Sequence, residues 1–146
     1  MRLPSKVFVD TSFLVALLNS SDADHAVALS LQSEARAQRI RKVTSEYVLM
    51  ELGDGLARLK FHQLASRLIS LLRQDPSFEI IPSSTDLFAK AVRLYDQRPD
   101  KEWGLTDCSS FVVMQELNLK AALSADHHFR QAGYQALLLD PPGNVD

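Results

Sequence analysis

Four acidic residues in this sequence occupy positions where a carboxylate can do chemistry. Asp10 ends the apolar run 7–9, which reads as a buried strand that stops at an acid and passes directly into a helix. Glu51 falls within two turns of a helix start, Asp107 lies at another helix start, and Asp126 follows a strand by two or three residues. Parallel strands bring strand ends and the following helix starts to one edge of a sheet, so these four acids are candidates for a single site.

Carboxylates brought together repel one another and raise one another's pKa, and proteins keep such clusters ionised mainly by binding cations. Oxygen ligands with open water positions suit Mg²⁺ or Mn²⁺, and the sequence shows no Cys/His spacing typical of zinc. Two such ions about 3.5–4 Å apart can activate a water molecule and stabilise the leaving oxygen of a phosphodiester. The acids therefore indicate metal-assisted phosphodiester hydrolysis.

Each acid also has an ordinary structural explanation when it is taken alone. Asp107 in a first helical turn complements the helix dipole, Asp126 after a strand end is a typical N-cap, and Glu51 suits an exposed helix flank. For Asp10 the functional interpretation is the stronger one, because ligands of open α/β sheets bind just outside the carboxyl ends of the strands.

The elements that position these acids alternate between strands and helices. We predict short strands near residues 7, 41, 78 and 121, with a last strand over 135–139. Helices are predicted over residues 13–18, 25–37, 45–59, 61–72, around 87–95 and over 107–117, with a brief helix that Gly133 stops. This alternation implies parallel βαβ units. The predicted fold is α/β, a three-layer α/β/α sandwich with a five-stranded parallel sheet.

Two local features of the predicted helices bear on packing. Thr106 is the predicted N-cap of the helix that carries Asp107. Gly53 and Gly55 fall inside the predicted helix over 45–59, where each glycine costs about 1 kcal/mol relative to alanine. We attribute both glycines to close packing.

Size and composition indicate a single domain over residues 1–146. The net charge of −2 gives no basic signature of a nucleic-acid binder, although local patches matter more than the total. The single cysteine, Cys108, excludes an internal disulfide and favours a reducing compartment. The longest apolar run, 13–18, is far shorter than the ~18 residues of a membrane span, and no signal-peptide core is present. We therefore expect a cytoplasmic protein without membrane contact.

Four segments hold the acids in a characteristic order. They are VFVDTSFLVA from residue 7, TSEYVLMEL from residue 44, LTDCSSF from residue 105 and SADHHFRQAGY from residue 124. Together they resemble the PIN-domain family, and most closely its VapC-like ribonuclease toxins. The resemblance runs from about residue 6 to residue 139, nearly the whole chain.

This resemblance implies a PIN-like nuclease domain with an acidic pocket for Mg²⁺ or Mn²⁺ and endonucleolytic cleavage of RNA. By position, the family's acidic residues are matched by Asp10, Glu51, Asp107 and Asp126. None of the family's matched acids is missing from the four segments, so the resemblance implies a catalytically competent enzyme.

Hydroxyl residues accompany the matched acids. Thr11 or Ser12 matches the family's hydroxyl residue after the first acid. Thr106 and Ser124 fall where a hydroxyl would orient a carboxylate or a water molecule. The resemblance further implies the toxin of a type II toxin–antitoxin system, with a small antitoxin protein as partner and a homodimer as the assembly.

Other reactive side chains have a structural interpretation. Cys108 has no evident base partner and reads as a buried helix residue. His127 and His128 flank the fourth acid and read as surface groups. Trp103 reads as a loop anchor packed on the core rather than as a base-stacking residue.

The densest basic run fits an RNA-backbone contact and a solvated helix end equally well. That run consists of Arg36, Arg39, Arg41 and Lys42.

Two other function classes remain open at this point. A phosphoaspartyl phosphatase or receiver-like domain would use Asp10 as nucleophile or phosphoacceptor. A dehalogenase-type phosphatase would need a second Asp at the position of Ser12, and a receiver would need acids within residues 1–9, where there are none. A non-catalytic PIN-like binding module would use the acidic pocket only to seat an arginine of a partner. The leading hypothesis is a metal-dependent endoribonuclease.

Overall fold

A five-stranded sheet forms the centre of the computed structural model, which describes residues 1–143; the remaining residues of the predicted domain, 144–146, lie outside the described part. The strand order is β3-β2-β1-β4-β5, and every pairing is parallel. The strands are β1 (Lys6–Val9), β2 (Arg41–Ser45), β3 (Phe78–Ile81), β4 (Ala121–Leu123) and β5 (Gln135–Ala136). The predicted α/β fold with a five-stranded parallel sheet is therefore confirmed.

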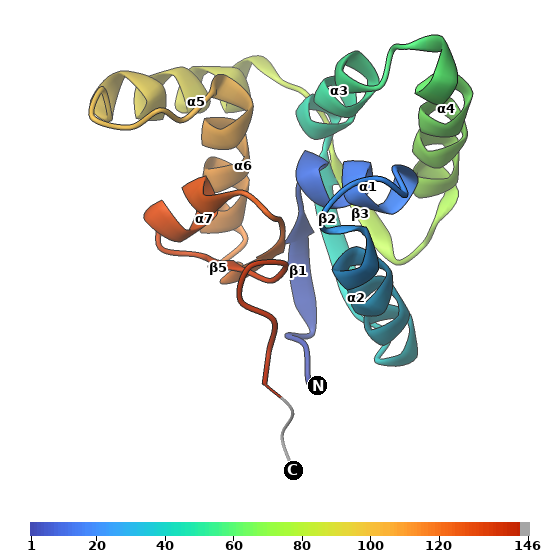
Figure 1. Ribbon diagram of the computed structural model, residues 1–146. Coiled ribbons are helices and arrows are strands. Elements are labelled where there is room, and N and C mark those ends of the chain that lie inside the picture. Colours follow the sequence, from blue (N-terminus) through green and yellow to red (C-terminus); the bar gives the residue numbers. More distant parts are fainter. Residues whose placement is uncertain (144–146) are drawn as a thin grey trace.

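Helices cover both sides of this sheet (Figure 1). Right-handed crossovers place the helices that lead toward β3 on one face and those that lead toward β5 on the other. The first group comprises α1 (Thr11–Leu18), α2 (His25–Ala37), α3 (Glu46–Gly55) and α4 (Leu59–Gln74). The second group comprises α5 (Thr85–Gln97), α6 (Leu105–Glu116) and α7 (His127–Gln131). Figure 1 shows the two groups on opposite sides of β1.

The strand order reverses at β1, which lies between β2 and β4. The chain moves outward from β1 to β3, and α5 and α6 then carry it back to the other side of β1. In open α/β sheets a crevice forms outside the carboxyl ends of the strands at such a reversal. Asp10 and Asp126 follow the strands on either side of this crevice, β1 and β4.

The core is built around β1 and α6. Val7, Phe8 and Val9 expose 1% or less of their surface. All seven residues of α6 from Cys108 to Met114 are buried, so this helix is surrounded on every side rather than amphipathic. Such burial leaves α6 little freedom to move, which makes its first turn a rigid platform for side chains at the crevice.

Two expectations about the elements are wrong. The predicted helix over 45–59 ends at Gly55, with Leu56 as C-cap, and Leu59 instead opens α4 with 98% of its surface exposed. The predicted strand over 135–139 stops at Ala136, because the amides of Leu139 and Asp140 turn back to the Ala136 carbonyl. In both places a continuous apolar pattern spans a change of local structure.

The explanation of the α3 glycines by close packing is also wrong. A Cβ atom added at Gly53 or Gly55 would meet no atom within 4 Å, so neither position is crowded. Gly133, in contrast, has a φ of 92° directly after the Ala132 C-cap of α7, which fits the predicted helix stop. Within residues 1–143, no helix has both the length and the hydrophobicity needed to span a membrane.

Candidate active site

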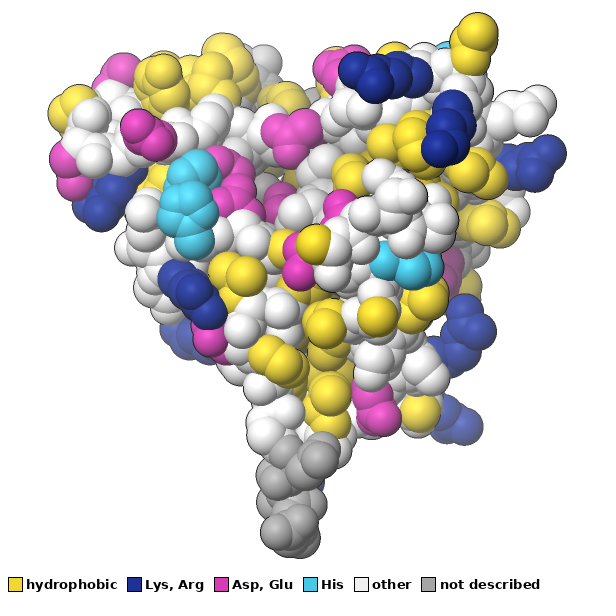
Figure 2. Space-filling view, viewed as in Figure 1, with side chains coloured by type: hydrophobic (Ala, Val, Ile, Leu, Met, Phe, Trp, Pro, Cys, Tyr) yellow, Lys and Arg dark blue, Asp and Glu magenta, His cyan; other side chains and the backbone are white. Residues whose placement is uncertain are grey.

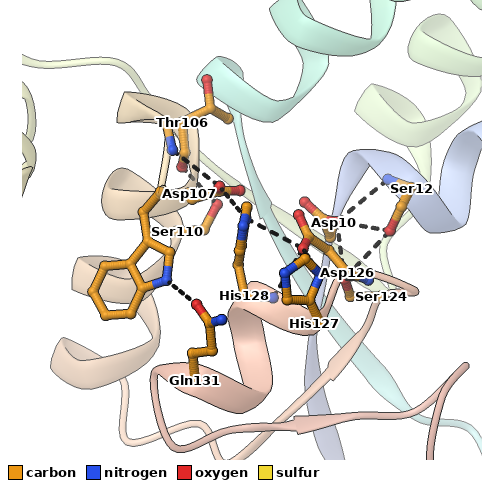
Figure 3. Close-up of polar contacts among 12 residues, drawn as sticks. Asp10, Ser12, Thr106, Asp107, Ser110, Ser124, Asp126, His127, His128 and Gln131 are labelled. Atoms are coloured by element: carbon orange, nitrogen blue, oxygen red, sulfur yellow. Dashed lines mark hydrogen bonds and ion pairs between the residues drawn. The ribbon is translucent and has the colours of Figure 1, made fainter. Parts of the chain in front are cut away.

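Asp10 caps α1 at the point where the chain leaves β1. Its side chain is 4% exposed. Its Oδ2 atom accepts hydrogen bonds from the Ser12 hydroxyl at 2.7 Å and the Ser124 hydroxyl at 2.9 Å, with the Ser12 amide at 3.4 Å (Figure 3). Burial, with a smaller contribution from the nearby charge of Asp107, outweighs these hydrogen bonds and raises the pKa of Asp10 to about 6.

The two serines tie the end of β1 to the end of β4. The Ser12 and Ser124 hydroxyl oxygens lie 3.3 Å apart. Ser12 Oγ also accepts from the Ala125 amide at 2.9 Å, and Ser124 Oγ accepts from the Asp126 amide at 3.0 Å. Thr11 points elsewhere, since its hydroxyl donates to the Val48 carbonyl of α3 at 3.5 Å. Of the two candidate hydroxyls after Asp10, Ser12 is therefore the one that contacts the carboxylate.

Asp107 and Asp126 reach the crevice from the starts of two helices. Asp107, third in α6, accepts from the Gly104 amide at 3.1 Å, and Asp126 caps α7 by accepting from the His128 amide at 2.9 Å. Their side chains are 15% and 28% exposed. Burial and then the charge of Asp126 raise the pKa of Asp107, so these acids are close enough to repel each other.

The three acids share one feature that bears on ligand binding. In each, every described hydrogen bond falls on one carboxylate oxygen: Oδ2 of Asp10, Oδ2 of Asp107 and Oδ1 of Asp126. Within residues 1–143 the other oxygen has no protein donor, and none of these unpaired oxygens is sealed away from solvent. Three carboxylate oxygens are thus left for a ligand that carries positive charge.

Glu51 is not joined to this cluster by any contact in the described residues. It is the sixth residue of α3 and is exposed. Because α3 packs against both α1 and α6, Glu51 belongs to a helix that borders the crevice. Its role in the site remains a prediction.

Thr106 differs from its prediction. It is the second residue of α6, whose N-cap is Gly104, because the Asp107 side chain already binds the Gly104 amide and starts the helix earlier. The Thr106 carbonyl accepts from the hydroxyls of Ser109 at 2.6 Å and Ser110 at 3.0 Å. Its own hydroxyl makes no hydrogen bond within residues 1–143, and Figure 3 shows it turned away from Asp107.

His128 was interpreted as a surface group, and that interpretation is wrong. Its side chain is 17% exposed, and its Nδ1 atom lies 3.1 Å from Asp107 Oδ2 and 3.3 Å from Asp126 Oδ1 (Figure 3). It therefore bridges the two acids. The sequence held one signal for this, since Asp126 as N-cap places residue 128 on the same first turn of α7. His127 is 66% exposed, as expected of a surface group, and its Nδ1 atom lies 3.6 Å from Asp126 Oδ1.

Two other structural interpretations are confirmed. Trp103 is 5% exposed, packs edge-on against Phe111 with ring centroids 5.0 Å apart, and donates its indole N–H to Gln131. Cys108 is buried, and burial raises the pKa of its thiol to about 11, which leaves no reactive thiolate near neutral pH.

The donor set fits a divalent cation. Figure 2 shows acidic side chains gathered around a hollow between the α1–α4 and α5–α7 halves, with histidine at its rim. Free carboxylate oxygens, together with carboxyl pKa values raised by burial and repulsion, match a site completed by a hard cation such as Mg²⁺ or Mn²⁺. Within the described residues, the side chains that offer ligand atoms all within 4.8 Å of one another are Asp126, His127 and His128, rather than the three acids.

Comparisons with known proteins agree with this fold. A PIN domain family model matches residues 7–134. The 23S rRNA-specific endonuclease VapC20 of Mycobacterium tuberculosis is 30% identical over 128 residues, which cover 88% of this chain and 95% of that protein. The crystal structure of VapC20, a Sarcin-Ricin loop cleaving toxin, matches with a TM-score of 0.79 at 29% identity, over 88% of this chain and 95% of that chain.

Two more distant solved structures share the fold alone. VapBC2 from Rickettsia felis, bound to a promoter DNA fragment, gives a TM-score of 0.61 at 16% identity, over 90% of this chain and 96% of that chain. FitAcB from Neisseria gonorrhoeae gives 0.58 at 22% identity, over 89% and 95%. The same sheet and helices are therefore kept where little sequence is shared.

Proposed function

The chain belongs to the PIN domain family, and from this premise we propose that it is a metal-dependent endoribonuclease that acts as the toxin of a type II toxin–antitoxin pair. One observation carries the proposal. Three partly or fully buried acids border the crevice at the reversal point of the sheet, and each keeps one oxygen free of protein donors. Folding tolerates this repulsion when a cation binds there.

Asp10, Asp107 and Asp126 would hold Mg²⁺ or Mn²⁺ through their free oxygens, and such an ion, when bound, would supply Lewis-acid chemistry at the phosphodiester and a more acidic water molecule. Ser12 and Ser124 hold Asp10 in one orientation from its other oxygen. Glu51 either binds the metal or positions the attacking water from the α3 side of the hollow.

His128 and the rigid first turn of α6 fix the remaining two acids. The imidazole bridges Asp107 and Asp126, so the relative placement of their free oxygens depends on it. The hydroxyls of Thr106 and Thr11 make no hydrogen bond to an acid in the described residues, so we assign the positioning of Asp10 to the two serines.

The proposed substrate class rests on the relative VapC20. VapC20 is named for cleavage of 23S rRNA and aligns along 95% of its own length. RNA is therefore the proposed substrate, and 23S rRNA within ribosomes is the first species to test. A small antitoxin protein and a second copy of the chain are the proposed partners, and the cytoplasm, which contains the RNA, is the proposed compartment. The phosphoaspartyl alternative receives no support from the family match.

Incubation of total cellular RNA and intact ribosomes with the purified protein tests the proposal. The reactions contain Mg²⁺, Mn²⁺ or EDTA, and Asp107→Asn and Asp96→Asn proteins run alongside. Asp96 is an exposed acid of α5 and serves as the matched control. We expect discrete fragments with either metal from the wild type and the Asp96→Asn protein only. Equal cleavage by the Asp107→Asn protein, or cleavage in EDTA, would contradict the proposed site.

A further inference from the structure

A polar cavity separate from the acidic hollow lies at the opposite end of the strands, where β2 begins. It has a volume of about 300 Å³, room for roughly ten water molecules. It is formed where α2 ends, where β2 begins and where the chain turns into β3. Its polar lining consists of Gln32, Arg36, Arg39, Lys42, Asp75 and Ser77.

The basic run 36–42 is not uniformly solvated, contrary to one of its two interpretations. Arg36, Arg39 and Arg41 are exposed, but Lys42 is 5% exposed. Its ammonium lies 5.1 Å from the ring centroid of Phe78, which is a cation–π contact. Within residues 1–143, the Lys42 ammonium makes no hydrogen bond and has no carboxylate within ion-pair distance, while the Lys42 backbone amide donates to the Ser77 carbonyl at 2.9 Å. Because no unpaired side-chain nitrogen of the described residues is sealed from solvent, the Lys42 ammonium reaches the cavity, where the charge of Asp75 acts on it without a direct contact and its donors are available to an anion.

One carboxylate oxygen of the acid in this cavity is engaged by Ser77. Asp75 Oδ1 accepts from the Ser77 amide at 2.8 Å and from the Ser77 hydroxyl at 2.7 Å. These bonds, together with the cations nearby, hold the pKa of Asp75 below its ordinary value, so Asp75 is ionised at neutral pH. The cavity therefore carries three cationic side chains against one carboxylate, in a chain whose net charge is −2. Figure 2 shows Lys and Arg side chains at the outer edge beside α2, away from the acidic hollow.

The rim arginine is held in an uncommon conformation. Arg39 has a φ of 54° in the turn after α2, where the Ile40 amide donates to the Ala35 carbonyl at 2.9 Å. Glycine fills this position with less strain. An arginine here places a guanidinium at the mouth of the cavity at some cost in backbone energy.

We propose that this cavity binds a phosphate group, with Lys42 as its central ligand and Arg36 and Arg39 at its rim. The site is separate from the acidic hollow. In the sheet Lys42 is paired with Val7, three residues before Asp10 and thus about 10 Å back along the strand. The phosphate comes either from the backbone of bound RNA or from a free phosphate ester.

Thermal unfolding in EDTA with increasing inorganic phosphate tests the site without any need for cleavage, so its failure is distinct from a failure of the nuclease proposal. Sodium chloride of equal ionic strength is the reference. Without metal the acidic hollow repels phosphate, so a specific rise in Tm reports the basic cavity. Lys42→Met removes the charge and keeps most of the stem volume. Lys60→Met is the matched control, because Lys60 lies 5.2 Å from the Phe61 ring centroid but is exposed.

We expect phosphate to raise the Tm of the wild type and of the Lys60→Met protein and to leave that of the Lys42→Met protein unchanged. Arg36→Gln, at an exposed position, should weaken the effect severalfold even if Lys42→Met does not fold. The proposal is overturned if phosphate stabilises the wild type no more than sodium chloride does, or stabilises the Lys42→Met and Arg36→Gln proteins equally well.

An RNA-binding experiment separates the two sources of phosphate. Binding of a short single-stranded RNA in EDTA is monitored by fluorescence anisotropy at several salt concentrations. If the RNA backbone is the ligand, Lys42→Met lowers the affinity and reduces the slope of log affinity against log salt by about one. If RNA binding is unchanged while the phosphate-dependent rise in Tm is lost, the ligand is a free phosphate ester.

Discussion

Asp10 is a carboxylate that folding places almost out of water. The same residue caps α1, accepts two serine hydroxyls and faces two other acids across the crevice. Burial raises its pKa to about 6, from about 3.8 in the unfolded chain. The folded state therefore binds this proton more tightly, and folding stability falls as pH rises from about 4 to about 6 and stays lower above that range. Ionised Asp10 costs on the order of 3 kcal/mol at neutral pH, which a bound cation would offset.

Replacement of Asp10 by Asn tests this cost. Asparagine keeps an oxygen for the two serine hydroxyls and carries no charge, so in EDTA at pH 8 we expect the Asp10→Asn protein to be more stable than the wild type by about 1–3 kcal/mol. The difference should close near pH 4, where the wild-type carboxyl is protonated. Urea denaturation at both pH values measures it, with Asp96→Asn as control. A less stable Asp10→Asn protein at pH 8 would refute the burial argument.

Ser124→Ala probes the hydrogen bond that counters the burial of Asp10. Loss of this donor should raise the pKa of Asp10 further, because the hydroxyl stabilises the ionised form. The acid limb of the pH–rate profile for RNA cleavage should then move to higher pH. Ser66→Ala, at an exposed position of α4, is the control and should leave the profile in place. An unshifted profile in the Ser124→Ala protein would remove this serine from the site.

His128 is the residue that sequence reasoning misjudged, and the reason is tertiary. Its neighbour Asp126 was identified, but the approach of α7 to the start of α6, which brings Asp107 to the imidazole, is not visible in either segment alone. We expect His128→Leu to weaken Mn²⁺ binding by about 10–100-fold, the range found when a residue that orients metal ligands is lost. His128→Asn should recover part of the affinity, and His62→Leu on α4 should have no effect. Unchanged affinity in His128→Leu would show that Asp107 and Asp126 need no bridge.

At the scale of elements, α3 ends where the apolar pattern continues. Sequence periodicity joined residues 45–59 into one helix, whereas the structure ends α3 at Gly55 and starts α4 at Leu59. Periodicity detects which residues can share a face but not where the backbone turns, and the two glycines were the better signal for the break. At α6 the helix is longer than predicted instead of shorter. The Asp107 side chain accepts from the Gly104 amide, so α6 begins before Thr106, the predicted N-cap.

Gly53 in α3 and Gly133, which follows the C-cap of α7, lead to opposite predictions for the effect of an alanine substitution on stability. Gly53 lies inside a helix with open space around it, so Gly53→Ala should stabilise the protein by about 0.5–1 kcal/mol. Gly133 has a φ of 92°, so Gly133→Ala should destabilise it by about 1 kcal/mol or more. Urea denaturation of both variants checks the pair. A destabilised Gly53→Ala protein would mean that α3 needs a flexible residue at this position.

At the scale of the whole molecule, the strand order decides which residues meet. The alternation of strands and helices was sufficient to predict the parallel sheet, and the buried run 7–9 was sufficient to predict that Asp10 ends a strand. The pairing of β1 with β4 rather than β5, and therefore the Ser12–Ser124 contact, depends on packing between segments more than 100 residues apart. Periodicity within a window carries no information about such pairings.

The central claim is that Asp10, Asp107 and Asp126 form one metal site. The most direct test is a titration of the metal-free protein with Mn²⁺. Binding is monitored by calorimetry or by the electron paramagnetic resonance signal of the free ion. Wild type, Asp10→Asn, Asp107→Asn and the control Asp96→Asn are compared at pH 8. We predict Mn²⁺ binding by the wild type and the control, and a loss of at least about tenfold in affinity in each site variant. Equal Mn²⁺ affinity in all four proteins, or no binding by the wild type, would contradict the claim.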